Sequence, residues 1–299
     1  MAKRTLVVLA AGMGSRFGGL KQIEPVGPNN EVLADYAVYD ALRYGFERVV
    51  FIIREQHLEL FKEKISDKFK DKIEVIYTFQ KLENGFSDVK IPLGREKMWG
   101  TTHALLAAKD YVDGPFLMIN ADDFYGSSEY KKVKDFFDTN KKENEYITIG
   151  YPFKSVSSNN GKVKRGVINT LNGIVTDIKE SEVEITDAGN IAYPLDKTEK
   201  FIIEDNHPVS MNFFGLKPSV FKYLEEDFDK FIHGDLDLNK ECLMADTLKA
   251  KIISNDIVFY NELSDSPWFG MTYKEDVIDV KNKILELIEK GEYPENLWR

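Results

Sequence analysis

The sequence predicts an α/β fold in which a mixed, mostly parallel sheet is flanked by helices and carries an antiparallel lobe. In the first half of the chain, apolar β-rich runs alternate with segments of helical length. A glycine-rich loop follows the first of these runs directly, and from about residue 162 the pattern changes to short β-like pieces. Strands that alternate with helices of this length indicate βαβ units with right-handed crossovers on a parallel sheet.

The expected elements follow the chain in this order. In the first half, strands are expected at 6–9, 49–53, 73–77, 116–119 and 146–151, with helices at 34–44, 56–69, 101–111 and 129–140. Residues 79–99 lack periodicity and predict a long loop, of the kind that often forms a lid or a binding loop. The second half predicts strands at 165–170, 173–179, 190–194, 200–204, 209–216 and 257–260, and helices at 218–231, 238–250 and 273–290.

Length and composition favour one continuous domain. A chain of 299 residues with 43% hydrophobic residues can build one large α/β domain or two smaller ones. No internal repeat, low-complexity tract or flexible linker divides it. We therefore expect a single domain, 1–299, made of an N-terminal lobe, 1–155, and a second lobe, 156–299.

Charge and cysteine content exclude several classes of protein. The chain has 40 basic and 50 acidic residues, a net charge of −10, which argues against a nucleic-acid or anionic-membrane partner. A local cluster of Lys and Arg could still hold a small anion. The single cysteine, Cys242, excludes an internal disulfide and a cysteine-rich metal site. The apolar run Leu6–Ala11 is too short for a secretory signal, and no stretch approaches a membrane span, so we expect a cytoplasmic protein.

The loop LAAGMGSRFGGLKQIEPVG, residues 9–27, is the first candidate site. Glycine costs backbone entropy and packs nothing, so a close approach of the backbone or an unusual φ must justify so many. Backbone N–H groups can converge on a phosphate, Arg16 could fork onto its oxygens, and Lys21 could act as a point charge. The glycines concerned are Gly12, Gly14, Gly18 and Gly19. The alternative is a tight strand-to-helix turn with exposed cations.

Two better-known phosphate loops do not fit these residues. There is no G-K-[ST] for a Walker A loop, and Phe17 stands where a dinucleotide-binding G-x-G-x-x-G needs its third glycine.

A second candidate site is NADD, residues 120–123, after the fourth expected strand. Ligands bind at the carboxyl ends of the strands in such sheets, so this segment and the glycine loop are expected at the same edge. Asp122 and Asp123 could provide a carboxylate for Mg²⁺, which takes one or two carboxylates, water and substrate phosphates. The alternative is that both aspartates cap the following segment.

The glycine loop resembles the signature of the nucleotidyltransferase family that makes nucleotide-sugars from an NTP and a sugar 1-phosphate. That signature is apolar-A-A-G-x-G-[ST]-R followed by a lysine, and LKQIEPV is similar to the glucose-1-phosphate thymidylyltransferase branch. The resemblance implies a Rossmann-like, GT-A-like nucleotidyltransferase fold, with an NTP-binding lobe at 1–155 and an acceptor-binding lobe at 156–299.

Further segments resemble the family in order along nearly the whole chain. TFQ resembles the base-reading segment, WGTTHAL the helix start against base and ribose, NADDFYG the metal segment, and KRGVI, VTDIKES and SMNFFGLKPSVFKYL the sugar site. The resemblance implies nucleotide contacts at Ala10, Ala11, Gly12, Gly14, Ser15, Gln80, Gly100 and Thr101. It implies acceptor contacts at Gly166, Glu180 and Asn212. His103, next to the base-reading segment, is expected to cap or pack.

Two positions depart from the family pattern. The family's glutamate is followed by a phosphate-binding lysine, whereas this chain has Ser181, and the open replacements are Lys179, Lys162 and Arg165. Gly270 stands where the second metal aspartate is expected, and Asp265 is the nearest substitute, so the implied metal ligands are Asp122 and Asp265.

The resemblance implies a Mg²⁺-dependent nucleotidyltransferase that joins an NTP to a sugar 1-phosphate and releases pyrophosphate. Arg16, Lys21 and Asp122 would be its catalytic residues, and a homo-oligomer is expected by analogy. Two alternatives stay open: a cytidylyltransferase for a non-sugar phosphate such as phosphocholine, and a catalytically weak nucleotide-binding module. Tyr151, Tyr193 and Trp268 could line a sugar pocket or belong to the core.

Overall fold

The computed structural model describes residues 2–12, 17–157, 161–271 and 273–299. Its strands are β1 (Thr5–Leu9), β2 (Arg48–Ile53), β3 (Glu74–Phe79), β4 (Phe116–Asn120), β5 (Asp123–Phe124), β6 (Glu145–Pro152), β7 (Val163–Leu171), β8 (Ile174–Thr186), β9 (Gly189–Pro194), β10 (Phe201–Ile203), β11 (Pro208–Leu216), β12 (Val258–Leu263) and β13 (Phe269–Gly270). Its α-helices are α1 (Leu33–Arg43), α2 (Leu58–Lys64), α3 (Thr101–Leu106), α4 (Ser127–Thr139), α5 (Phe153–Val156), α6 (Val220–Ile232), α7 (Met244–Ile253) and α8 (Asp276–Glu289). None of the helices in these ranges is long and apolar enough to cross a membrane.

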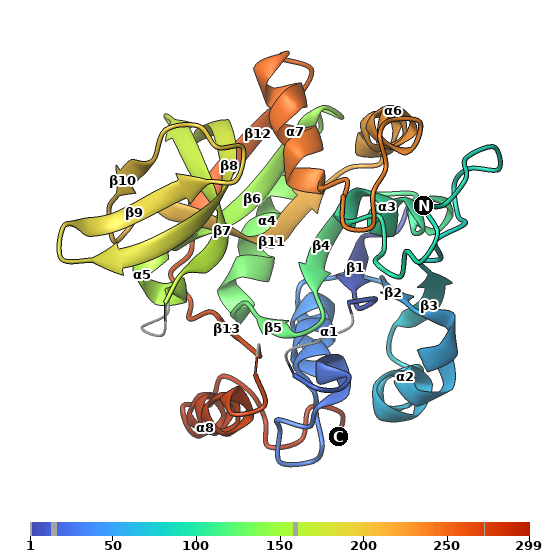
Figure 1. The fold of residues 1–299 in the computed structure, drawn as a ribbon. Helices are drawn as coiled ribbons and strands as arrows, with labels where there is room; N and C mark the ends of the chain where they lie inside the picture. The colour runs from blue at the N-terminus through green and yellow to red at the C-terminus, as the bar shows by residue number, and fades with distance from the viewer. Residues whose placement is uncertain (1, 13–16, 158–160, 272) are drawn as a thin grey trace.

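One large sheet runs through both lobes in the order β10-β9-β8-β12-β6-β11-β4-β1-β2-β3, and β7 pairs with β8 and β11 (Figure 1). Strands β3, β2, β1 and β4 are parallel neighbours, as are β6 and β12. The antiparallel pairing of β7, β8, β9 and β10 agrees with the antiparallel lobe expected from about residue 162. The expectation of a mostly parallel sheet is wrong at β11, which lies antiparallel between β4 and β6. Short turns join β7 to β8 and β8 to β9, and such turns make antiparallel neighbours.

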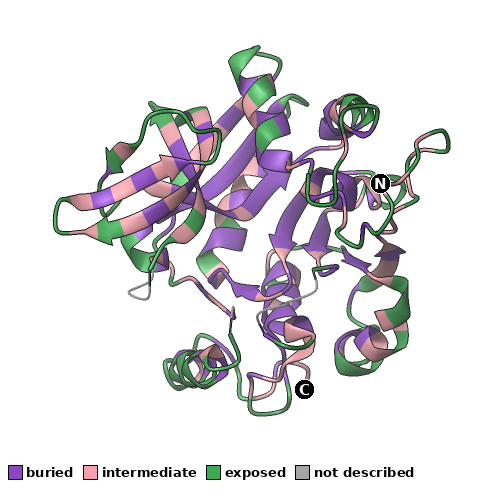
Figure 2. Cartoon of the chain, in the orientation of Figure 1, coloured by how far each residue is buried: buried purple, intermediate pink, exposed green. Residues whose placement is uncertain are grey.

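Side-chain alternation along the strands builds two hydrophobic layers, one on each face of the sheet. Leu6 and Val8 of β1 face a layer with α1 and α4, whereas Val7 faces a layer with α3, α6 and α7. Both faces of the central strands are buried, as the purple strands of Figure 2 show. This explains why these strands read as continuous apolar runs. A third cluster packs α8 against β5, β13 and the start of α1.

Each expected helix and strand has a counterpart, and several boundaries are shifted; the strand expected at 173–179, for example, continues to Thr186. The predicted helix at 56–69 is α2 with a short 3₁₀ turn on either side, and the chain leaves helical geometry at Ile65. The predicted helix at 238–250 begins at Met244, because Asp237 Oδ1 accepts the backbone N–H groups of Asn239 and Lys240 and makes a turn there. Residues 80–100 contain no helix or strand, as expected.

Candidate active site

A cavity of about 910 Å³ opens at the carboxyl ends of β1, β2 and β4. It is lined by the loop after β1, the start of α3, and two loops, 94–98 and 238–241, that face each other. Seven of the predicted site residues line it: Ala11, Gly12, Lys21, Gln80, Gly100, Thr101 and Asp122. Ala10 lies just behind, where its N–H donates to Ile52 O (2.9 Å). Gly14, Ser15 and Arg16 lie outside the described residues.

The backbone of the glycine loop is held by two side chains that the sequence did not predict to belong to the site. Gln22 Nε2 donates to Gly12 O (2.8 Å), and Arg54 Nε donates to Ala11 O (3.2 Å). Gln22 is buried beside the cavity, and its Oε1 has no hydrogen-bond partner among the described residues. Arg54 places a cation on the cavity wall, and burial lowers its pKa. Its position directly after β2, at the same sheet edge as the glycine loop, is the signal that could have identified it.

Gln80 ends β3 and meets the start of α3. Its Nε2 donates to Gly100 O (3.1 Å) and lies 3.3 Å from His103 Nδ1. The imidazole of His103 is buried, stacks on Phe228 with 4.8 Å between ring centroids, and contacts Asn84 O through Nε2 (3.0 Å). Burial lowers the pKa of His103 to about 4, so the ring is neutral near pH 7. His103 does pack, as expected, but it also contacts Gln80.

Gly100 must be glycine at this wall of the cavity. Its φ is +100°, and a Cβ here would collide with Cys242 O. The segment after it is held to the loop before α7, since Cys242 O accepts from Thr102 N (3.1 Å) and Thr101 Oγ1 accepts from Met244 N (2.9 Å). The two walls of the cavity are thus joined by backbone contacts.

Lys21 and Asp122 meet at the edge of the cavity. The Lys21 ammonium forms an ion pair with Asp122 Oδ2 and donates to Met271 O (3.0 Å). The side chains are only about one-fifth and one-seventh exposed, at 21% and 15%. Thus the two predicted catalytic residues that the structure describes are in contact.

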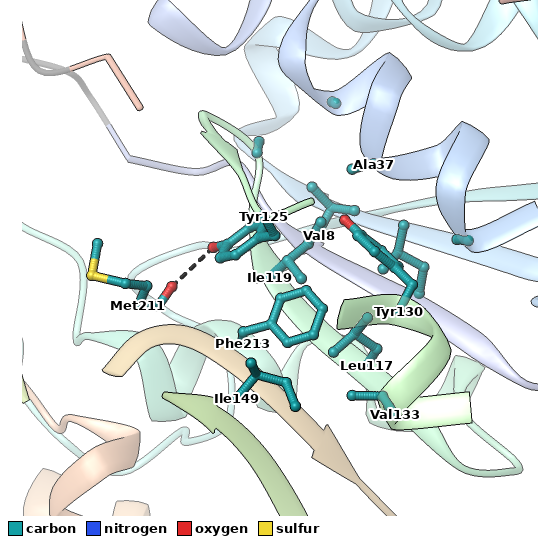
Figure 3. Packing of buried hydrophobic residues seen from close by; sticks show 14 of the residues in the cluster. Val8, Ala37, Leu117, Ile119, Tyr125, Tyr130, Val133, Ile149, Met211 and Phe213 are labelled. Atoms are coloured by element: carbon teal, nitrogen blue, oxygen red, sulfur yellow. Dashed lines mark hydrogen bonds between the residues drawn. The ribbon is translucent and has the colours of Figure 1, made fainter. Parts of the chain in front are cut away.

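Asp123, the next residue along the chain, is buried. Its Oδ2 accepts from Asn120 Nδ2 (2.8 Å) and lies 3.2 Å from the Tyr125 hydroxyl, which donates to Met211 O (2.9 Å; Figure 3). Burial, and then the negative charge of Asp122, raise the pKa of Asp123 to about 7. Neither described aspartate accepts a backbone N–H of the next helix, so the capping alternative has no support.

The lack of a side chain at Gly270 leaves space for the carboxylate of Asp123. Gly270 pairs with Asp123 across β13 and β5, and a Cβ on residue 270 would collide with Asp123 Oδ1. Asp265 does not lie near Asp122. Its carboxylate is 89% exposed, pairs with Lys132 of α4 and does not line the cavity. Asp123, its neighbour in the chain, therefore remains the carboxylate next to Asp122. The sequence alone could not exclude Asp265, because its position depends on tertiary contacts such as its ion pair with Lys132.

The predicted acceptor residues lie on β7, β8 and β11. Gly166 is opposite Glu180 in the ladder, and a Cβ on Gly166 would lie 3.0 Å from Glu180 Oε1. Asn212 adopts a φ of +61° at an irregularity in β11, and its Nδ2 lies 3.4 Å from Asn120 Oδ1. Asn212 is therefore linked through Asn120 to Asp123, which joins the second lobe to the carboxylates.

Three cations are candidates to replace the phosphate-binding lysine that is absent at Ser181, and their surroundings differ. Arg165 is the cross-strand partner of Ser181, so the two side chains leave the same face of the ladder. Its guanidinium donates to Val156 O (2.7 Å) and Lys164 O (2.8 Å) and lies over Trp268. Lys179 and Lys162 instead reach Thr198 and Glu184.

Charge around Arg165 connects the two lobes. Burial lowers its pKa, an effect that the carboxylates of Asp123 and Glu180 oppose. Burial raises the pKa of Glu180, and so does repulsion from Asp246, whereas the positive charge of Arg165 lowers it. Arg165 therefore lies in the field of both Glu180 and Asp123.

Of the aromatic side chains considered for a sugar pocket, Tyr151 is fully buried and donates to Tyr125 O (2.6 Å), so it belongs to the core. Tyr193 lies under the ammonium of Lys162, and Trp268 under Arg165.

Comparison with known proteins relates the chain to a family. Residues 5–257 match the family described as Nucleotidyl transferase. The curated protein "Bifunctional protein GlmU" of Methanococcus maripaludis is 25% identical over 206 residues, which cover 61% of this chain, and the chain spans only 45% of that relative's length.

Three solved structures share the fold at low identity. A Bacillus anthracis protein assigned as a glucose-1-phosphate thymidylyltransferase, with sucrose bound, has a TM-score of 0.63 and 15% identity over 94% of this chain and 95% of its own. A UDP-glucose pyrophosphorylase with UDP-glucose has a TM-score of 0.61 and 19% identity over 95% and 99%. The inositol-1-phosphate CTP transferase of T. maritima has a TM-score of 0.59 and 15% identity, and the match covers 96% of this chain and 98% of its own. The chain is therefore a mixed α/β enzyme of the nucleotidyl transferase family, and it shares its fold with these solved structures.

Proposed function

We propose that this protein transfers the nucleotidyl group of an NTP to a sugar 1-phosphate and releases pyrophosphate. The observation that carries the proposal is the contact of Lys21 with Asp122 at the cavity edge, where the glycine loop and the metal segment meet. The cavity on one side takes the nucleotide, and β7, β8 and β11 on the other side take the acceptor.

In this reaction an oxygen of the acceptor phosphate attacks the α-phosphorus and forms a new P–O bond. The bond from the α-phosphorus to the bridging oxygen breaks, and pyrophosphate leaves with its electron pair. The acceptor oxygen is already anionic, so no general base is needed. Catalysis then depends on positioning and on neutralising charge, as in other phosphoryl transfers. Lys21 would bridge the α-phosphate and the acceptor, and Arg16 would stabilise the leaving pyrophosphate.

Asp122 fits a Mg²⁺ ligand because it is a carboxylate that lines the cavity, and Lys21, which pairs with it here, would then turn to the phosphates. Among the described residues no group of three or more His, Cys, Asp or Glu side chains is placed to hold a metal. Mg²⁺ binds readily through one carboxylate when water and substrate phosphates complete its shell, and there it would neutralise the triphosphate. The neighbouring carboxylate, Asp123, accepts a hydrogen bond from Asn120.

We propose that Arg165 replaces the phosphate-binding lysine that is absent at Ser181. It stands opposite Ser181 in register and in the field of both Glu180 and Asp123. Glu180, Gly166 and Asn212 would contact the hydroxyls of the sugar. The whole site would then run from Gln80 at the base end to Glu180 at the sugar end.

The test is pyrophosphate release with Mg²⁺ across dTTP, UTP, CTP, GTP and ATP, each with a pool of sugar 1-phosphates and, separately, with phosphocholine. Release that requires both an NTP and the sugar pool supports the proposal. Release only with CTP and phosphocholine would instead make the protein a cytidylyltransferase for a non-sugar acceptor. Tight NTP binding without release in any arm would identify a nucleotide-binding module.

A further inference from the structure

Two segments that line the cavity, 94–98 and 238–241, have no helix or strand of their own. The first lies in the long loop between β3 and α3, and the second lies in the loop between α6 and α7. Residues 237–241 are all exposed, so burial in the core does not hold them. Side-chain contacts must hold this part of the wall, because a segment with few buried apolar contacts opens readily.

The guanidinium of Arg95 joins the two segments. Its Nη1 donates to Asp237 O (2.5 Å), and its Nη2 donates to Lys240 O (2.7 Å). Nη2 also donates to Met98 O (3.1 Å), within its own segment. One charged group is therefore bound by three carbonyl oxygens from both segments, and hydrogen bonds from a charged donor are stronger than neutral ones.

Arg95 is a built part of the wall and not a surface contact. The residue is only 6% exposed, and its guanidinium carbon lies 3.7 Å from the ring centroid of Trp99, which is fully buried. The indole of Trp99 is fixed in turn, since its N–H donates to Leu82 O (2.8 Å). The guanidinium thus presents its flat face to an aromatic ring and its edges to carbonyl groups, an arrangement that a lysine ammonium cannot reproduce.

The other side-chain contact between the segments is more exposed. Lys97 pairs with Glu241 (2.6 Å) and donates to Asn239 O (3.2 Å), but the side chains of the ion pair are 45% and 34% exposed. Ion pairs with this exposure contribute little, because water and salt screen them. The buried contacts of Arg95 are therefore the main restraint on residues 237–241.

We infer that Arg95 is a positioning residue that holds segment 237–241 against segment 94–98 and so completes the wall of the nucleotide cavity. Without it, the second segment can leave the cavity, and the fraction of molecules with a complete wall falls. The apparent dissociation constant of the nucleotide then rises in inverse proportion to that fraction. Lys21 and Asp122 are held by other contacts, so the rate at saturating nucleotide is preserved. This role rests on the proposed function, since it assumes that the cavity takes an NTP.

Hydrogen exchange on the full chain without nucleotide tests the contact itself. The backbone N–H groups of Asn239 and Lys240 donate to Asp237 Oδ1, so these two amides report on the order of the segment. Arg95→Met should speed their exchange at least tenfold and leave the amides of β1 and β4 unchanged. Equal exchange in Arg95→Met and in the unsubstituted protein would show that Arg95 does not hold the segment.

Nucleotide affinity, measured by calorimetry without an acceptor, tests the consequence. UTP, dTTP, GTP, CTP and ATP, each with Mg²⁺, are compared on the unsubstituted protein, and the one that binds most tightly is used. Its dissociation constant should rise at least tenfold in Arg95→Met. It should rise at least threefold in Arg95→Lys, which keeps the charge but loses the planar fork. Unchanged affinity in Arg95→Met would overturn the inference even if the amides exchange faster.

Arg48→Met is the matched control. Arg48 also donates to a backbone carbonyl, Tyr111 O (2.7 Å), but it stands at the start of β2, whereas the cavity lies at the carboxyl end of that strand. This variant should change the dissociation constant less than twofold, whatever it does to the melting temperature. An equal loss of affinity in Arg48→Met and Arg95→Met would assign the effect to general destabilisation.

Steady-state kinetics separate positioning from catalysis. Arg95→Met should raise the KM for the NTP at least tenfold, retain kcat within threefold, and leave the KM for the sugar 1-phosphate within twofold. A tenfold fall in kcat with an unchanged KM for the NTP would contradict a positioning role.

Exchange in the unsubstituted protein covers the case in which Arg95→Met fails to fold. A saturating nucleotide should slow exchange at Asn239 and Lys240, because it binds the molecules with a complete wall. Unchanged exchange at these amides would refute the inference while leaving nucleotidyl transfer possible. If none of the five nucleotides binds, both the inference and the proposed function fail. If nucleotide affinity depends on Arg95 as expected but no acceptor supports pyrophosphate release, only the proposed function fails.

Discussion

The ammonium of Lys21 forms an ion pair with the carboxylate of Asp122, although the two residues come from loops after different strands. Strands β1 and β4 are parallel neighbours, so their carboxyl ends lie side by side and bring the two loops together. Lys21 also donates to Met271 O, which holds the third segment, after β13, at the same point. A cation and a carboxylate that are already in contact can exchange each other for a phosphate and a metal ion when substrate arrives.

The first prediction concerns Lys21. Lys21→Ala should lower the rate of pyrophosphate release roughly 10²- to 10³-fold, about 3–4 kcal/mol, by analogy with the loss of one electrostatic donor in other enzymes. Lys62→Ala, which removes an exposed lysine of α2 that pairs with Glu59, is the matched control and should leave the rate unchanged. A loss below tenfold in Lys21→Ala, with an unchanged melting temperature, would remove Lys21 from the mechanism.

The second prediction separates the two aspartates that the sequence offers as metal ligands. Asp122→Ala should abolish Mg²⁺-dependent activity, and excess EDTA should do the same to the unsubstituted protein. Asp265→Ala should change the rate less than twofold, because this side chain is 89% exposed and pairs with Lys132. Mg²⁺ titrations of the rate for both variants provide the measurement, and a raised Mg²⁺ requirement in Asp265→Ala would contradict the structure.

The third prediction is a coupling between Gly270 and Asp123. Gly270→Ala should destabilise the protein, because the new Cβ collides with Asp123 Oδ1, and that short side chain is held by Asn120. Asp123→Ala removes the colliding oxygen, so Gly270→Ala should cost less stability in that background. Urea denaturation of the two single variants and the double variant gives the interaction free energy. Additive effects would show that the two residues do not share this space.

The fourth prediction identifies the cation at the acceptor site. Arg165→Met should raise the KM for the sugar 1-phosphate at least tenfold while leaving the affinity for the NTP nearly unchanged. Lys179→Met and Lys162→Met are the comparisons, since these lysines contact Thr198 and Glu184. Because Arg165 also donates to Val156 O, the melting temperature is measured in parallel. A KM effect confined to Lys179→Met would transfer the role to that residue.

The fifth prediction is a fall in stability as pH rises from about 4 to 7. Burial raises the pKa of Asp40 to about 7, although Tyr293 donates to its Oδ2 (2.6 Å), and burial likewise raises that of Asp123 to about 7. In this window the folded protein holds protons that the unfolded chain releases. The free energy of unfolding therefore decreases with rising pH, by up to about 1.4 kcal/mol per pH unit for each group.

Asp40→Asn tests this contribution away from the active site. The variant should lose part of the pH dependence of the melting temperature between pH 5 and 7.5. Asp67→Asn, at an exposed carboxylate that pairs with Lys70, should keep all of it. Identical pH profiles for Asp40→Asn and the unsubstituted protein would show that the Asp40 carboxylate does not titrate in this range.

By itself, the sequence determined the parts of this protein that depend on local pattern. Apolar runs and helical segments predicted the strands and helices, and the contact of Lys21 with Asp122 could be expected because both follow parallel strands. Only the tertiary structure decided that β11 enters the sheet antiparallel, that Asp265 pairs with Lys132 and does not join Asp122, and that Gln80 contacts Gly100 and His103. Each of these depends on contacts between segments far apart in the chain, such as Asp265 with Lys132 or Gln80 with His103, and no local pattern encodes which backbone or ring atom a distant side chain will meet.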